Sequence, residues 1–67
     1  MTDLKWIEEE IERYKIIKNG IITILKEPHH EESFKSFLIN GLIECENTLI
    51  FLYHFKSELE ELEAKND

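Results

Sequence analysis

A single break divides this chain into two long segments, each with a helical repeat of apolar residues. Residues 27–30 read Glu-Pro-His-His, and the chain has no other proline. Proline cannot continue a helix that precedes it, whereas the first turn of the next helix tolerates it. The break therefore predicts an all-α fold, an antiparallel hairpin of two helices joined by a short turn.

The first segment has apolar residues three, four and seven positions apart, a spacing typical of one face of a helix. These residues are Leu4, Ile7, Ile11, Tyr14, Ile17, Ile21, Ile22, Ile24 and Leu25, with Trp6 at the edge of the face. The β-branched run at 21–25 would favour a strand if it stood alone. Because the periodicity continues on its N-terminal side, we expect a helix over about residues 3–26.

The second segment predicts a helix over about residues 32–64, after a turn over about 27–31, so that residues 1–67 form one domain. Its main apolar stripe consists of Phe34, Phe37, Leu38, Gly41, Leu42, Cys45, Leu49, Leu52, Phe55, Leu59 and Leu62. If the turn is centred near residue 29, position i of the first helix faces roughly position 59 − i of the second. This register places Lys18 near Gly41, and Lys56 near Asp3.

The second helix carries more apolar surface than one facing helix covers. Ile39, Ile43 and Ile50 lie about 100–140° from the main stripe, and Phe51 lies near the opposite edge. The second helix is also the longer one, so its Leu59–Leu62 end extends past the first. The economical arrangement is a homodimer in which two hairpins form a four-helix bundle. The expected interface with the second copy or another partner is Ile39, Ile43, Ile50, Phe51, Leu59 and Leu62.

Size and charge narrow the classes of function. Chains of about 60 residues bury only about 60% of the surface that they expose when unfolded, and such domains often need oligomerisation. Cys45 is the only cysteine, which indicates a reduced, cytoplasmic protein. The net charge of −7 disfavours contact with nucleic acid. Glu44 and Glu46 at the centre of the apolar run 37–55 disfavour a membrane span.

No group of residues predicts catalysis, a cofactor or a metal site. Residues 29–32 are His-His-Glu-Glu, but adjacent positions on a helix point about 100° apart and do not converge on one ion. His54 falls on the polar side of the second helix. Cys45 lies in the main stripe, where an apolar setting does not favour a thiolate. The chain also lacks a nucleophile–base pair and a glycine-rich phosphate loop, so we expect no enzymatic activity.

Three residues interrupt the apolar faces. Lys18 and Lys56 either extend their ammonium groups to solvent while their methylene stems pack, or pair with a carboxylate of a facing helix. Gly41 costs roughly 1 kcal/mol relative to alanine in a helix interior. Either the close approach of another helix or simple tolerance accounts for it.

Acidic residues gather at the end of the chain, where the last ten residues hold five acids and one lysine. We call Glu58, Glu60, Glu61 and Glu63 the acidic overhang. These carboxylates either solvate a helix end or form an acidic face for a basic partner. The absence of valine and glutamine beside ten isoleucines is typical of an AT-rich genome, such as that of a low-GC bacterium or a phage.

The sequence therefore predicts a small acidic, non-enzymatic interaction protein, a regulator, adaptor or inhibitor that acts by protein–protein binding. Two alternatives stay open. One is a structural or assembly protein whose self-associating bundle is itself the product. The other is an acidic mimic of nucleic acid that blocks a DNA-binding protein. No motif identifies a particular family.

Overall fold

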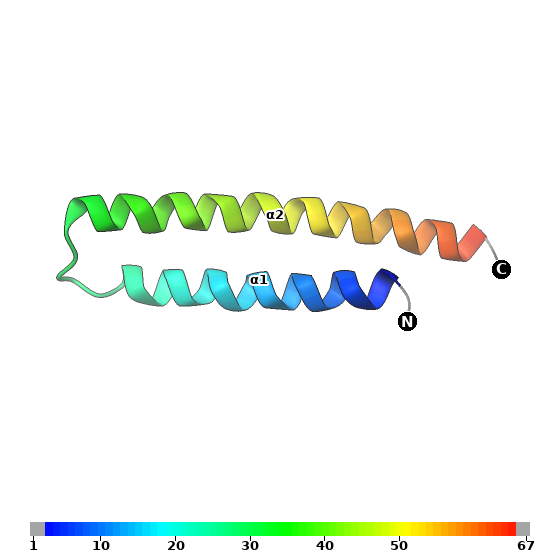
Figure 1. The fold of residues 1–67 in the computed structure, drawn as a ribbon, viewed down its shortest axis with the longest axis horizontal. Coiled ribbons are helices and arrows are strands. Elements are labelled where there is room, and N and C mark those ends of the chain that lie inside the picture. The colour runs from blue at the N-terminus through cyan, green and yellow to red at the C-terminus, as the bar shows by residue number, and fades with distance from the viewer. Residues whose placement is uncertain (1–2, 66–67) are drawn as a thin grey trace.

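The chain forms two helices that pack antiparallel against each other, as Figure 1 shows for the computed structural model, which describes residues 3–65. Helix α1 spans Asp3–Leu25 and helix α2 spans Glu32–Lys65. Both helices begin and end within one residue of the predicted bounds. The prediction of an all-α helical hairpin is confirmed.

The turn over residues 26–31 is held by local contacts. The amide of Glu27 donates a hydrogen bond of 3.0 Å to the carbonyl of Ile24, a tightened last turn of α1. Pro28 has no amide to extend the helix further. The ring of His30 packs on Phe34 with 5.1 Å between the ring centroids. The turn is thereby attached to the first turn of α2.

The core lies between the helices, nearer the start of α1 than the turn. Its contiguous cluster joins two residues of each helix, namely Ile7, Ile11, Leu49 and Leu52, with Tyr14 and Leu59 packed against it. The side chain of Ile7 is the most enclosed, with 1% of its surface exposed. Leu38 and Cys45 are buried nearer the turn, so Cys45 is a core residue, as predicted.

The register between the helices differs from the predicted one by about one helical turn. Lys18 pairs with Glu46 and does not lie opposite Gly41. Figure 1 shows the reason: the connection continues past the end of α1 before it reverses, so α2 begins further out than α1 ends. As a result, α2 extends beyond α1 at both ends of a hairpin that measures 55 × 16 × 14 Å.

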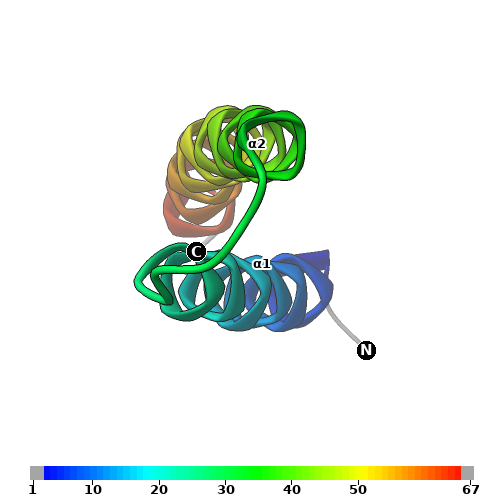
Figure 2. The same ribbon diagram turned by 90° about the vertical axis from the view of Figure 1, so that its left-hand side faces the viewer.

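Helix α1 covers a narrower strip of α2 than the predicted main stripe. Four members of that stripe keep more than a third of their surface exposed: Phe34, Phe37, Phe55 and Leu62. A single facing helix reaches only the residues nearest the line between the two axes, and Figure 2 shows that the axes are also inclined to each other. The main stripe was therefore predicted too wide, because part of it faces sideways or lies beyond α1.

Candidate interaction surfaces

The hairpin has two open sides, and a groove runs between the helices on each. On one side the groove, of about 360 Å³, is lined by residues that include Ile17 and Ile21 of α1 and Phe37 and Gly41 of α2. On the other side the groove, of about 600 Å³, is lined by residues that include Lys15 of α1 and Ile50 of α2. The two sides differ in chemistry.

The first side carries large apolar residues from both helices, and we call it the aromatic face. On α2, steps of seven and four residues lead from Phe37 to Phe51, Phe55 and Leu62, so these four side chains share one side of the helix. On α1, three full turns separate Trp6 from Ile17, so these two also share one side. All of these side chains are exposed in the hairpin, with 71% of Phe37 and 64% of Phe51 open to solvent. The aromatic face consists of Trp6, Ile17, Phe37, Phe51, Phe55 and Leu62.

Two aromatic rings of this face are already ordered against each other. Phe51 and Phe55, one turn apart on α2, stack with 6.2 Å between their centroids and 11° between their planes. Stacked rings expose a flat apolar surface that loses little side-chain entropy when another molecule covers it. Glu44 lines the same groove and is the one carboxylate among its lining residues.

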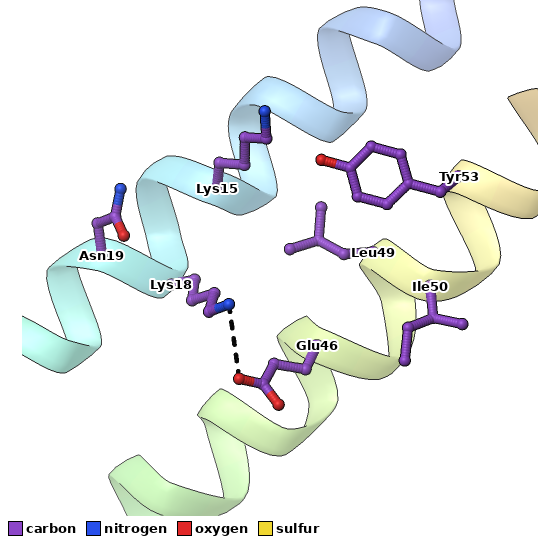
Figure 3. A pocket seen from close by; sticks show the side chains of 7 residues that line it. All are labelled: Lys15, Lys18, Asn19, Glu46, Leu49, Ile50 and Tyr53. Carbon is purple, nitrogen blue, oxygen red and sulfur yellow. Dashed lines mark ion pairs between the residues drawn. The ribbon is translucent and has the colours of Figure 1, made fainter.

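The second side carries apolar residues from α2 alone, and we call it the isoleucine face. It consists of Ile39, Ile43, Ile50 and Tyr53, all of them exposed. Figure 3 shows that the α1 side of this groove is polar, with Lys15, Lys18 and Asn19 opposite Ile50 and Tyr53. A groove with one apolar wall and one polar wall suits an amphipathic segment better than a second apolar layer of helices.

Lysines that interrupt the apolar faces make ion pairs between the helices. The ammonium of Lys18 lies 3.5 Å from a carboxylate oxygen of Glu46, as drawn in Figure 3. The ammonium of Lys56 lies 4.0 Å from Glu8, so the predicted pairing with Asp3 is wrong. All four side chains are at least 30% exposed, and such pairs contribute about 0–1 kcal/mol each. They favour the observed register more than they stabilise the fold.

Gly41 opens the groove on the aromatic face. A Cβ built at Gly41 would meet the Cδ1 of Ile21 at 3.6 Å, which is ordinary van der Waals contact. Packing against α1 therefore leaves room for a methyl group at this position. Within the hairpin nothing requires a glycine here, although it weakens the helix by roughly 1 kcal/mol.

The structure divides the predicted interface residues among three places. Ile39, Ile43 and Ile50 lie on the isoleucine face, and Phe51 and Leu62 on the aromatic face. Leu59 is half-buried against the core cluster. Sequence reasoning missed the rest of the aromatic face. Two spacings could have revealed it: steps of seven and four residues through positions 37, 51, 55 and 62, and the three helical turns between positions 6 and 17.

The acidic overhang is exposed along its whole length. Its first member, Glu58, lies 3.1 Å from Nε2 of His54 one turn earlier, and the His54 side chain is itself 73% exposed. The C-terminal end of α2 extends past the start of α1 (Figure 1). These carboxylates are therefore open to another molecule.

Within residues 3–65, no three side chains of the metal-ligating kinds come together. Neither α1 nor α2, over the same part of the chain, is long and apolar enough to cross a bilayer. A comparison of the chain with protein-family models, curated proteins and solved structures finds no match.

Proposed function

We propose that this chain is a non-enzymatic interaction protein that works as a homodimer, with the aromatic faces of two hairpins packed together as a four-helix bundle. The isoleucine face then stays open for a protein partner, in keeping with a regulator, adaptor or inhibitor in the reducing cytoplasm. The observation that carries the proposal is the aromatic face itself, because both helices contribute exposed apolar side chains to it.

The amount of exposed surface supports a second copy as the occupant. The hairpin exposes 5413 Å². A compact folded monomer of 8.1 kDa typically exposes about 4,500 Å², roughly 900 Å² less. A stable protein–protein interface takes about 800 Å² from each partner. The surplus of the hairpin thus matches what one dimer interface covers.

A four-helix bundle needs both helices of each hairpin at the interface. The aromatic face meets that need, since Ile17 of α1 and Phe37 of α2 line its groove, and Trp6 and Phe55 lie further along the same sides of their helices. On the isoleucine face the α1 side presents Lys15 and other polar groups. Packing two such faces together would bury those groups, which is costly unless each finds a partner.

The experiment compares one glutamate substitution on each face. In Phe51→Glu a buried charge would stand in the dimer interface, so we expect a monomer with reduced helicity. Ile43→Glu places the same charge on the isoleucine face, so we expect it to stay dimeric. Light scattering at micromolar concentration measures the mass, and circular dichroism measures the helicity.

Each outcome has a clear meaning. If Ile43→Glu dissociates and Phe51→Glu does not, the isoleucine face is the dimer interface. If the unmodified protein is monomeric and stable throughout this range, the proposal fails. If the Ile43→Glu variant is dimeric, it also tests whether the isoleucine face binds a partner. In a pull-down, the variant should then fail to retain a protein that the unmodified dimer retains.

A further inference from the structure

The charge of the hairpin is divided between its two halves. The half that holds the termini, residues 3–12 of α1 and 51–65 of α2, carries nine acids and three bases, a net of −6. The half that holds the turn, residues 13–50, carries five acids and five bases and is neutral. The contacts of Lys18 with Glu46 and of Lys56 with Glu8 establish which residues share a half.

We infer that the second copy packs on the aromatic face in the antiparallel orientation, with its turn beside the termini of the first. The inference rests on the proposed homodimer and adds its geometry. A parallel dimer would bring two halves of −6 together. An antiparallel dimer places each acidic half against a neutral half that contains most of the basic residues.

The distances between packed helices are short enough for the electrostatic difference between the two orientations to persist in physiological salt. Packed helices lie about 8–10 Å apart, and the Debye length at 0.15 M ionic strength is about 8 Å. Charges on neighbouring helices of the two copies therefore interact with only partial screening.

The antiparallel orientation also gives the acidic overhang a specific neighbour. If the midpoints of the two α2 helices coincide, the overhang lies at the level of the second copy's turn, where Lys26 is exposed.

Zero-length cross-linking tests the orientation on the unmodified protein. Equal amounts of unlabelled and ¹⁵N-labelled chain are unfolded, refolded together and treated with a carbodiimide, which joins lysine ammonium groups to nearby carboxylates. Peptide pairs of mixed isotope content come from two different copies. We expect mixed pairs that join residues 57–63 to Lys26. Mixed pairs that instead join residues 57–63 to Lys5 or Lys56 would establish the parallel orientation and overturn the inference.

A distance measurement provides a second, independent test. Nitroxide labels are attached to cysteine in Glu61→Cys or Asn47→Cys, with Cys45→Ala removing the native thiol. At 1.5 Å per residue, the antiparallel dimer separates the labels at position 61 by about 37 Å along the axis, whereas labels near the midpoint at position 47 stay close in either orientation. A short separation at both positions overturns the inference.

The two proposals fail in distinguishable ways. A chain that shows no mixed-isotope pairs and a monomeric mass refutes the homodimer, and the inference falls with it. A dimeric mass with links between like ends refutes only the antiparallel orientation. If the Cys45→Ala background does not dimerise, the cross-linking result alone decides.

Discussion

Replacing the two glycines of the hairpin by alanine, one at a time, tests whether another molecule packs closely over the groove of the aromatic face. Gly41 lies in that groove, and Gly20 lies outside it on exposed α1 surface. A Cβ at Gly20 would meet no atom within 4 Å, and one at Gly41 would make only ordinary contact with Ile21. In an isolated hairpin, both substitutions should therefore stabilise.

The expected magnitudes separate the two cases. Alanine in place of glycine in a helix interior adds about 1 kcal/mol to the free energy of unfolding. For a domain of this size, 1 kcal/mol raises Tm by about 4–8 °C. If a second copy packs closely over Gly41, the added methyl group overpacks the interface at a cost of about 1–3 kcal/mol. Gly20→Ala should then stabilise, while Gly41→Ala should leave stability unchanged or lower it by up to about 2 kcal/mol per copy.

The assay is urea unfolding followed by circular dichroism at several protein concentrations, because the stability of a dimer rises with concentration. We expect Gly41→Ala to weaken dimerisation and Gly20→Ala to leave it unaffected. Equal stabilisation by the two substitutions, with the same concentration dependence as the unmodified chain, would refute the reasoning. The groove at Gly41 would then be open to solvent.

Three further predictions concern the core, the ion pairs and the acidic overhang. Leu52→Ala leaves a cavity in the core cluster that contains Ile7 and should lower the free energy of unfolding by about 2–5 kcal/mol. Helicity measured by circular dichroism should then largely disappear, and unchanged helicity would contradict the assigned core. Glu46→Gln removes the pair with Lys18 and should lower the free energy of unfolding by less than about 1 kcal/mol, with no difference at 1 M salt. Glutamine at all four positions of the acidic overhang should leave helicity and dimer mass intact, because exposed charges each contribute below about 1 kcal/mol; a monomeric mass would show that these carboxylates hold the dimer together.

The helices and their bounds were predictable from the sequence, because Pro28 and the apolar periodicity are local signals. The register was not, since the path of the turn depends on contacts such as that of His30 with Phe34, which no periodic pattern encodes. An error of one turn in the register was enough to place Lys56 beside the wrong carboxylate.

The aromatic face was predictable only in part. The surplus of apolar residues on α2 indicated an uncovered surface, and Phe51 and Leu62 were identified. The contribution of α1 was missed because Ile17 was assigned to the side of α1 that packs on α2, and Trp6 to the edge of that side. A helical wheel of one helix does not show how narrow a strip its partner covers, which depends on the distance and inclination between the axes.

The position of the core cluster gives the hairpin an uneven resistance to local opening. Ile7, Ile11, Leu49 and Leu52 hold the helices together near the termini, while near the turn most apolar residues of α1 are only half-buried. Amide hydrogens around the core cluster should therefore exchange with solvent most slowly, and those flanking the turn and in the exposed end of α2 should exchange faster. The covalent connection is thus at an end of the hairpin that opens more readily than the core cluster.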